Sequence, residues 1–522
     1  MSLASLPPFA NEPYRDFSLP ENREAMERAL ARVRADLGRQ YPLLIAGLHE
    51  PGGIHKLLSY NPSHPAELIG VHQKASADQA TRAIEAAYHY FPTWAAVPAE
   101  DRAARALRAA HILRQRKDEF NAWLILESGK NWNEAEADTA EAIDFCDYYA
   151  RQMLRLASPG PLLQLPGELG VLTYIPLGVG VILPPWNFPL AILAGMTIAA
   201  LVTGNTVVLK PSSETPTIAA KFIEVLLEAG FPPESFQFLT GAGSEVGDLL
   251  VSHPKTRFIS FTGSKEVGLH INELAAKTQP RQKWIKRVVA EMGGKDAILV
   301  DREVHDLDAA AAGVIASAFG FQGQKCSACS RLILDEPLHD AFLAKLIPLA
   351  EALTQGPADD PAHFLGPVIS QRAEKTILSY IETGKQEGAL LTGGHQAPGD
   401  GYFIRPTIFS GIEHNHRLFQ EEIFGPVLAV TRARDFDDAL RLANDSDYGL
   451  TGAVYTTNPE KIARARAEFH VGNLYINRKC TGAMVGAHPF GGFNLSGTDS
   501  KAGGPDYLLQ FLQAKSIAQK LL

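Results

Sequence analysis

The sequence has few cysteines and no visible secretion signal. Its four cysteines are spread over 522 residues, far too few for a disulfide-stabilised scaffold, so a reducing compartment is expected. The first residues lack a basic start followed by an apolar run, so we expect no signal peptide and a cytoplasmic location.

An excess of basic charge is also lacking. The chain carries a formal net charge of -9 at pH 7, so it offers no basic field that would release counterions from a nucleic acid. Hydrophobic residues make up 46% and charged residues 20%, which is the ordinary range of globular proteins. These values argue against nucleic acid as the main partner, and the motifs described below indicate a small-molecule substrate instead.

Only one uncharged run attracts attention as a membrane span. Residues 191–209 contain no charged side chain, and about 20 apolar residues suffice to cross a bilayer as a helix. Pro185 and Pro189 precede the run, however, and Gly204 and Asn205 interrupt it. We therefore expect a buried helix, a turn and a buried strand, and no membrane span.

Length and pattern predict more than one domain. At 522 residues the chain is too long for a single core. Helical spacing dominates the first 156 residues, and from Gly178 onwards apolar strands alternate with helices. A second alternating region runs from about residue 291 to 476. Continuous apolar strands that alternate with helices predict an α/β fold with parallel sheets covered on both faces.

Two segments do not fit this alternation. Residues 159–176 form short apolar runs split by prolines and glycines, a pattern that predicts a β-hairpin arm outside the packed layers. Residues 507–522 read as a strand or tail. Because both segments would expose apolar surface on a monomer, we expect at least a homodimer.

The most informative local feature is the run Gly-Gln-Lys-Cys that ends at Cys326. A cysteine is a strong nucleophile near neutral pH when its surroundings stabilise the thiolate. Three upstream runs accompany it, at residues 185–189 (PWNFP), 261–264 (FTGS) and 291–295 (EMGGK). Together they supply a nucleophile, an oxyanion donor, a nucleotide-binding turn and a carboxylate base. This set suits the oxidation of an aldehyde through a thioester.

Two glycine turns follow predicted strands. Residues 263–268 (GSKEVG) open a helix, whose N-terminus offers free N–H groups and a positive dipole to a pyrophosphate. Leu269-His270 stands where a Walker A loop needs Lys-Ser/Thr, so a kinase or ATPase is disfavoured. Residues 241–247 (GAGSEVG) depart from the dinucleotide fingerprint by one residue. Each turn alone is also compatible with plain turn chemistry.

Cys326 and Cys329 form a C-x-x-C pair, which is the spacing of redox dithiols and of half of many zinc sites. No second pair follows, and no histidines stand at metal-ligand spacing. We therefore expect no metal site and interpret Cys329 as a packed thiol.

Taken in order, these motifs resemble the aldehyde dehydrogenase superfamily over nearly the whole chain. The resemblance implies a Rossmann-type NAD-binding domain at residues 1–157 and 177–290. It also implies an α/β catalytic domain at residues 291–494, and an oligomerisation arm and tail at residues 158–176 and 495–522.

The resemblance further implies a role for each motif. Cys326 would attack the aldehyde, while Asn187 and the backbone N–H of Cys326 would hold the developing oxyanion. Hydride would leave for nicotinamide, and Glu291 would activate the water that hydrolyses the thioester. Singly, the asparagine could satisfy turn backbone and the glutamate could form a cap or an ion pair. The implied cofactor-binding residues are Pro185, Trp186, Lys210, Ser213, Gly243, Gly263, Ser264, Glu422 and Phe424.

The C-terminal loop narrows the substrate. Residues 489–508 (PFGGFNLSGTDSKAGGPDYL) look very like the 1-pyrroline-5-carboxylate dehydrogenase branch of that superfamily. The implied reaction is the NAD-dependent oxidation of L-glutamate γ-semialdehyde, the opened form of 1-pyrroline-5-carboxylate, to L-glutamate in proline catabolism. The implied substrate-binding residues are Ser327, Gly482, Ala483, Phe188, Phe490 and Glu141.

Alternatives remain at this point. Another aldehyde dehydrogenase, such as one for succinate semialdehyde, would share the catalytic motifs, and a binding relative could keep the fold without the chemistry. Many relatives place a glutamate three residues after the strand-end lysine, where it would repel a 2′-phosphate. Ser213 occupies that position here, so we expect NAD with weaker use of NADP. A separate proline dehydrogenase is compatible as a partner.

Overall fold

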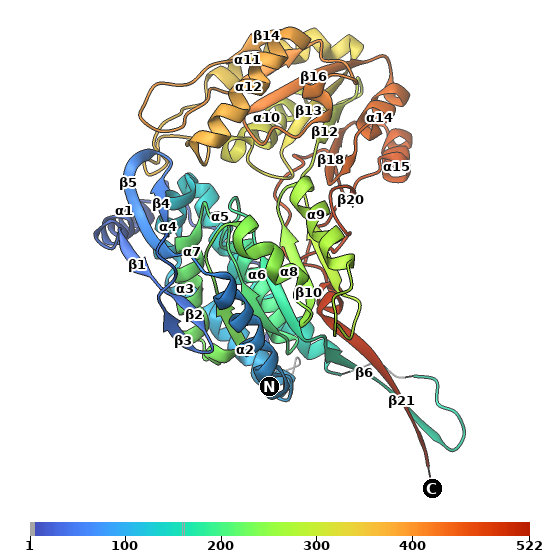
Figure 1. Cartoon of the computed structure of the whole chain (residues 1–522). Helices are drawn as coiled ribbons and strands as arrows, with labels where there is room; N and C mark the ends of the chain where they lie inside the picture. Colours follow the sequence, from blue (N-terminus) through green and yellow to red (C-terminus); the bar gives the residue numbers. More distant parts are fainter. Residues whose placement is uncertain (1–5, 159, 161, 522) are drawn as a thin grey trace.

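The computed structural model describes residues 6–158, 160 and 162–521. Predictions that fall on residues 1–5, 159, 161 and 522 lie outside this part of the chain. Two lobes, each built on a seven-stranded sheet, lie one above the other in Figure 1, and a two-stranded ribbon extends from the lower lobe. The predicted α/β class is confirmed.

The first sheet contains the strands that the sequence predicts from Gly178 onwards. β7 pairs in parallel with β8 and β10. The short N-terminal strands β2 and β3 extend one edge of the sheet and pair antiparallel. In spatial order the sheet comprises β11 (Arg287–Glu291), β10 (Thr256–Thr262), β7 (Val179–Leu183), β8 (Thr206–Leu209), β9 (Phe236–Phe238), β2 (Leu43–Ile45) and β3 (Leu48–Glu50).

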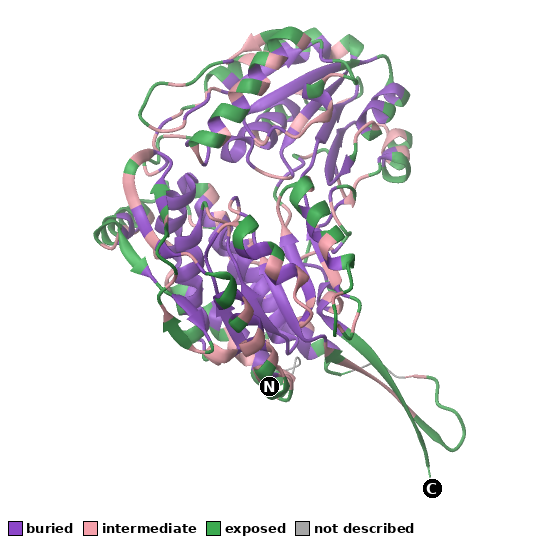
Figure 2. Ribbon diagram, viewed as in Figure 1, coloured by how far each residue is buried: buried purple, intermediate pink, exposed green. Residues whose placement is uncertain are grey.

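Both faces of this sheet are covered. Val181 and Ile182 are neighbours on β7 and point to opposite faces, yet each has 0% of its surface exposed. This double burial explains why the strands read as continuous apolar runs, and Figure 2 shows the sheet buried between helices. The helices of this lobe are α1 (Pro20–Ala35), α2 (Ala77–Ala95), α3 (Ala99–Gln115), α4 (Lys117–Ser128), α5 (Trp132–Leu156), α6 (Ala191–Val202), α7 (Pro216–Glu228), α8 (Asp248–Ser252) and α9 (Lys265–Ala276).

The uncharged run at residues 191–209 forms α6, a turn at Thr203–Gly204 and strand β8, as predicted. Among the residues that the structure describes, no helix is both long enough and apolar enough to cross a membrane. A smaller sheet consists of β1 (Arg39–Tyr41), β5 (His64–Gln73) and β4 (Lys56–Asn61).

The second sheet is parallel except for its edge strand β14. It comprises β14 (Ala389–Thr392), β15 (Thr407–Ser410), β16 (Val427–Ala433), β13 (Cys329–Asp335), β12 (Asp296–Val300), β18 (Thr451–Tyr455) and β19 (Asn473–Ile476). Its helices are α10 (Leu307–Phe319), α11 (His339–Glu351), α12 (Gln371–Glu387), α13 (Arg417–Gln420), α14 (Phe436–Asn444) and α15 (Pro459–Glu468). A short pair joins β17 (Tyr448–Gly449) to β20 (Phe493–Asn494).

The ribbon differs from the predicted hairpin. β6 (Glu168–Pro176) pairs antiparallel along its full length with β21 (Leu512–Lys520), near the end of the chain (Figure 1). The prediction of a hairpin within residues 159–176 was therefore wrong, because the strand partner comes from the C-terminal segment. The first part of the predicted tail does not belong to the ribbon and lies beside the end of β11. There the Met292 backbone N–H donates to the Ser496 carbonyl, and the Thr498 N–H donates to the Ala290 carbonyl.

Candidate active site

Two cavities meet at Cys326. The larger has a volume of about 840 Å³ and lies at the ends of β7, β8 and β10. The smaller has a volume of about 420 Å³ and lies against α5 and the loop that follows β19. Cys326 and Thr262 line both cavities. A group on the cysteine sulfur is therefore accessible from two separate chambers.

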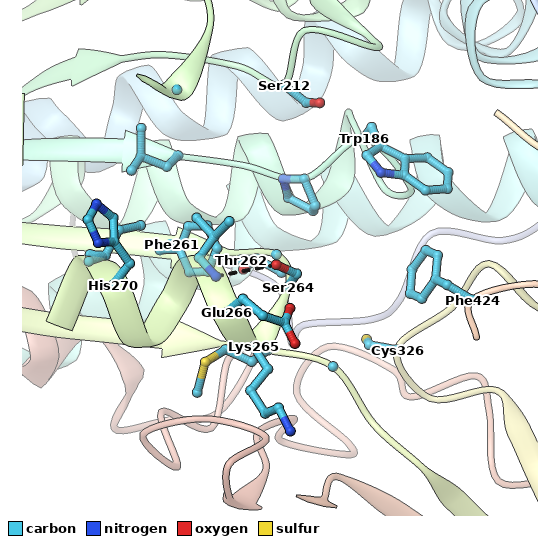
Figure 3. Close-up of a pocket in the computed structure, with 18 of the residues that line it drawn as sticks. Trp186, Ser212, Phe261, Thr262, Ser264, Lys265, Glu266, His270, Cys326 and Phe424 are labelled. Atoms are coloured by element: carbon cyan, nitrogen blue, oxygen red, sulfur yellow. Dashed lines mark hydrogen bonds between the residues drawn. The ribbon is translucent and has the colours of Figure 1, made fainter. Parts of the chain in front are cut away.

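The larger cavity contains the predicted turn residues. Gly263 and Ser264 line it, and Ser264 caps helix α9 by accepting a hydrogen bond from the Val267 N–H at 3.3 Å. Figure 3 shows this helix start between His270 at one end of the cavity and Cys326 with Phe424 at the other. Pro185, Trp186 and Gly243 also line the cavity. The arrangement offers a helix N-terminus to an anionic group.

Lys210 lies at the C-terminal end of β8 and lines the larger cavity. Burial lowers the pKa of its ammonium group to about 8. Its Nζ donates to the Pro211 carbonyl at 3.2 Å, and an ammonium has three hydrogens to donate. The side chain can therefore still donate to a hydroxyl group in the cavity.

Glu422 and Phe424 approach from the second lobe. Glu422 accepts a hydrogen bond from the Gly294 N–H at 3.0 Å, and a Cβ atom at Gly293 would lie 2.0 Å from its Oε2. Gly293 is therefore needed for the carboxylate to lie there. Burial raises the pKa of Glu422 to about 7. Phe424 has a left-handed φ of 57° and makes an edge-to-face contact with Trp186 at 5.4 Å.

Ser213 lies just outside the larger cavity. The residue that lines the cavity at this position is Ser212, whereas the Ser213 hydroxyl donates to the Gly241 carbonyl at 3.4 Å. The spacing from Lys210 thus identifies the correct loop, but it does not place the Ser213 side chain on the wall of the cavity.

A strained turn presents Cys326. Phe321 and Gln322 have φ values of 50° and 55°, in the left-handed region. Gly323 follows with φ 67°, and a Cβ atom there would lie 2.3 Å from the Gly425 carbonyl oxygen. Burial, the largest effect, raises the pKa of the Cys326 thiol well above its ordinary value, and nearby carboxylates raise it further. The sulfur is therefore held as a thiol in this arrangement and must lose its proton to react.

Asn187 is next to the cysteine segment. Its side chain is 4% exposed, and its Nδ2 donates to the Gln324 carbonyl at 3.0 Å. The bond ties the asparagine loop to the cysteine turn two residues before Cys326. A side-chain amide nitrogen carries two hydrogens. Because Asn187 also lines the larger cavity, its second Nδ2 hydrogen can be donated to an oxygen there.

Glu291 ends strand β11 and lines the smaller cavity. Ser500 donates to its Oε1 at 2.5 Å, and its Oε2 is buried without a hydrogen-bond partner among the described residues. Burial raises the pKa of Glu291 to about 7, although hydrogen bonds from Ser500 oppose the rise. A carboxyl group with this pKa can exchange a proton near neutral pH.

All six predicted substrate residues line the smaller cavity. One group comes from the cysteine segment and the loop after β19, and another from α5 and the asparagine loop. Gly482 has φ 78°, a conformation that glycine adopts without strain. Burial and nearby carboxylates raise the pKa of Glu141 to about 8. The six are Ser327, Gly482, Ala483, Phe188, Phe490 and Glu141.

Several lining residues were not predicted. Tyr14, Arg15 and Lys479 line the smaller cavity, and Ser500 holds Glu291. Ser500 lies within residues 489–508, the C-terminal run that indicated the substrate. The run therefore identified this segment, but it did not indicate that Ser500 binds Glu291. Tyr14 and Arg15 have no motif or spacing that links them to the site.

A buried lysine also went unnoticed. The Lys130 ammonium lies 4.0 Å from the ring centre of Phe188 and 3.9 Å from that of Phe321. It forms an ion pair with Asp138 at 3.6 Å. Asp138 in turn accepts a hydrogen bond from the Ala191 N–H at 2.7 Å. Lys130 thus connects the cysteine turn, the asparagine loop and α5.

The remaining cysteines are packed thiols. Cys329 is buried and its Sγ donates to the Arg331 carbonyl at 3.4 Å. All four cysteines are free, and no cluster of possible metal ligands occurs in residues 6–158, 160 and 162–521. Cys329 therefore matches its interpretation as a packed thiol.

Comparison with known proteins identifies close relatives. The sequence model of the aldehyde dehydrogenase family matches residues 50–517. The chain is 56% identical over 512 residues to 1-pyrroline-5-carboxylate dehydrogenase from Geobacillus thermodenitrificans, covering 98% of this chain and 99% of the relative. It is 52% identical over 511 residues to the enzyme of that name from Bacillus subtilis, with the same coverage.

Solved structures agree with these relatives. A structure of 1-pyrroline-5-carboxylate dehydrogenase from Thermus with bound NAD has a TM-score of 0.97 and 51% identity, covering 99% of this chain and 100% of that one. Proline utilization A from Bdellovibrio bacteriovorus has a TM-score of 0.97 and 45% identity, covering 99% of this chain and 53% of that one. Betaine aldehyde dehydrogenase from Staphylococcus aureus, at 29% identity, has a TM-score of 0.87 and covers 92% of this chain and 97% of that one.

Proposed function

This chain belongs to the aldehyde dehydrogenase family, and we propose that it oxidises L-glutamate γ-semialdehyde to L-glutamate with NAD. The observation that carries the proposal is the meeting of two cavities at Cys326, one lined by eight of the nine predicted cofactor residues and one by all six predicted substrate residues. The full-length similarity to 1-pyrroline-5-carboxylate dehydrogenases supports the same substrate.

The larger cavity fits a dinucleotide. Its volume of about 840 Å³ lies within the range of about 300–1,000 Å³ for ligand and cofactor pockets. Ser264 and the start of α9 would hold the pyrophosphate, and Lys210 and Glu422 the ribose hydroxyls. Phe424 and Trp186 would flank the nicotinamide. NAD supplies the hydride acceptor when bound.

Cys326 carries the covalent step. Its thiol gives up a proton, and Sγ bonds to the aldehyde carbon, whose oxygen takes up the negative charge. The second Nδ2 hydrogen of Asn187 and the Cys326 N–H stabilise this oxyanion. Loss of hydride from the same carbon, which NAD would accept when bound, re-forms the C=O bond and leaves a thioester on Sγ.

Glu291 serves the second step. It takes a proton from a water molecule that attacks the thioester carbon, and the C–S bond breaks to release L-glutamate. Ser500 fixes one carboxyl oxygen of Glu291. The other oxygen has no partner among the described residues and is free to accept the proton of water.

The smaller cavity supplies recognition of the amino acid end. Ser327 and the backbone N–H groups of Gly482 and Ala483 would bind the substrate carboxylate, since glycine lets the backbone approach a ligand closely. Glu141 would face the ammonium group. Phe188 and Phe490 would enclose the aliphatic stem between the two ends.

The domain division belongs to the proposal. Residues 1–157 and 177–290 would bind the cofactor, and residues 291–494 would carry the nucleophile. The ribbon of β6 and β21 would pair subunits, because Leu169, Ile175 and Ile517 on it are 43%, 36% and 40% exposed. A cytoplasmic location and a separate proline dehydrogenase as supplier are further parts of the proposal.

A second candidate is an aldehyde dehydrogenase for succinate semialdehyde. That substrate shares the distant carboxylate and would use the same Gly482–Ala483 loop. It lacks an ammonium group, however, and would bring no cationic group of its own to Glu141, whose pKa burial raises to about 8. The acidic wall of the smaller cavity therefore favours the amino acid substrate.

NADH formation tests the proposal. We expect a strong preference for 1-pyrroline-5-carboxylate over succinate semialdehyde and over an apolar aldehyde, with NADP used less well than NAD. Preference for another aldehyde would reject the substrate and keep the mechanism. Cofactor binding without oxidation of any aldehyde would support a binding relative instead.

A further inference from the structure

Residues 6–16 form a segment without helix or strand that we call the N-terminal strap. We propose that the strap is part of the substrate site, where it closes the mouth of the smaller cavity and restricts the enzyme to short aldehydes with a charged end. This inference rests on the proposed function and deepens it. It assigns substrate selection to a segment that precedes the matched family region, which begins at residue 50.

The strap reaches the cavity directly. Tyr14 and Arg15 line the same cavity as Cys326 and Glu141. Tyr14 is 56% exposed, whereas Glu291 and Cys326 at the reacting end are only partly exposed. Tyr14 therefore marks the mouth of the cavity and Cys326 its inner end.

One edge of the strap is fixed to the proposed carboxylate-binding loop. The Asn11 Nδ2 donates to the Val485 carbonyl at 2.9 Å, and the Tyr14 hydroxyl contacts the Met484 sulfur at 3.6 Å. Met484 and Val485 directly follow Ala483. A displacement of the strap would therefore change the position of the groups that bind the far end of the substrate.

The other edge is fixed to α5. The Asn11 Nδ2 also donates to Asp144 at 2.8 Å, and the Glu12 N–H donates to the same carboxyl group at 2.7 Å. The Arg15 N–H donates to Glu136 at 2.8 Å. Asp144 and Glu136, which also line the cavity, are thus bonded to the strap, whereas Glu141 between them is not. The strap therefore occupies two of the α5 carboxylates that line the cavity.

The strap is also held rigidly outside the cavity. Lys117 donates to the Pro13 carbonyl at 2.9 Å, and Arg15 forms an ion pair with Asp118 at 3.0 Å. Phe9 packs edge-to-face on Tyr148 at 5.0 Å. These anchors do not involve Tyr14, so a change of Tyr14 alone leaves the strap in place.

Substitution of Tyr14 in the full chain tests the inference. For Tyr14→Ala we expect the KM for 1-pyrroline-5-carboxylate to rise about tenfold with kcat changed less than about twofold, because the ring contributes to binding and not to chemistry. We expect kcat/KM for hexanal to rise relative to that for propanal, since the open mouth admits a longer chain. Tyr14→Phe keeps the ring and should retain wild-type selectivity.

Tyr60→Ala is the matched control. Tyr60 lies on β4, is 46% exposed and lines neither cavity, so this variant should match the wild type in KM and in selectivity. An equal effect of Tyr60→Ala, or no effect of Tyr14→Ala on KM and on the hexanal to propanal ratio, would overturn the inference.

Failure of the inference can be told apart from failure of the proposed function. If the wild type oxidises other aldehydes but not 1-pyrroline-5-carboxylate, the proposed substrate is wrong. The strap is then judged by the hexanal to propanal ratio alone, which must still rise in Tyr14→Ala. If the wild type oxidises 1-pyrroline-5-carboxylate and the ratio is unchanged, only the strap inference is rejected.

Discussion

The two cavities that meet at Cys326 are built differently. The larger is lined by turns at the ends of parallel strands, as at Lys210 and Gly263, so its shape follows from the sheet itself. The smaller is lined by one face of α5, a long loop and the N-terminal strap, which come from distant parts of the chain. The first can serve any aldehyde, whereas the second can differ between enzymes while the sheet stays the same.

The two cavities also differ in the charged groups that they offer to a ligand. The larger offers a helix N-terminus and Lys210, which suit an anionic cofactor. The smaller is walled by carboxyl groups of α5, and burial there raises the pKa of Glu141 to about 8. Glu141 thus offers a partner to a cationic group in the smaller cavity, whereas the start of α9 and Lys210 offer donors to an anionic group in the larger. Each prediction below changes one cavity and asks whether the other keeps its function.

The largest effect is expected at the residue that both cavities share. Cys326→Ala should lower the rate of NADH formation by about 10⁴-fold or more, because no other group can form the thioester. Binding of NAD, measured by calorimetry, should remain close to that of the wild type. The control Cys329→Ala removes a packed thiol and should stay active. Substantial turnover by Cys326→Ala would disprove the covalent mechanism.

Glu291→Gln should separate the two chemical steps. We expect steady-state turnover to fall by about 10²–10⁴-fold, the range for loss of a general base. The first turnover should still yield NADH in a rapid-mixing experiment, because hydride leaves before water attacks. Loss of the first turnover as well would show that Glu291 is needed earlier, for example to take the thiol proton.

How much of this site follows from sequence depends on how each wall is made. The residues at strand ends were predictable, because a strand, a turn and a helix start leave a local pattern. Tyr14 and Arg15 were not, since only tertiary packing brings the strap to α5. Ser213 illustrates a finer limit: its loop was found, but the side chain that faces the cavity is that of Ser212.

The wrong hairpin has the same origin. The short apolar runs of residues 159–176 predict strand structure, but nothing local specifies the strand partner. The partner β21 comes from the far end of the chain. Local sequence therefore predicts the elements of this molecule better than it predicts their long-range pairing.

The pH profile should report the same carboxyl group as the Glu291→Gln experiment. Since burial raises the pKa of Glu291 to about 7, the carboxylate form that accepts a proton disappears as the pH falls below that value. We expect kcat under hydrolysis-limited conditions to fall about tenfold per pH unit below the pKa. Glu291→Gln should have a flat profile in this range. An unchanged slope in the variant would assign the titration to another group.

Glu141→Gln tests the acidic wall of the smaller cavity. The KM for 1-pyrroline-5-carboxylate should rise about tenfold, because a charge-assisted bond to the ammonium is lost. The KM for succinate semialdehyde, which has no ammonium group, should not rise, and NAD binding should be unaffected. Equal changes for both aldehydes would indicate that the variant disturbs the whole cavity instead.

The smallest effect is expected at Ser213, on the larger cavity. Ser213→Glu adds a negative charge beside the strand-end lysine, and we expect it to reduce kcat/KM for NADP by several-fold while NAD changes little. The KM for 1-pyrroline-5-carboxylate should stay constant, because the two cavities share only the region around Cys326. Ser212→Glu is the matched comparison, since Ser212 lines the cavity and Ser213 does not. If Ser212→Glu alone discriminates against NADP, the position that selects the cofactor in this chain is one residue earlier than the spacing from Lys210 predicts.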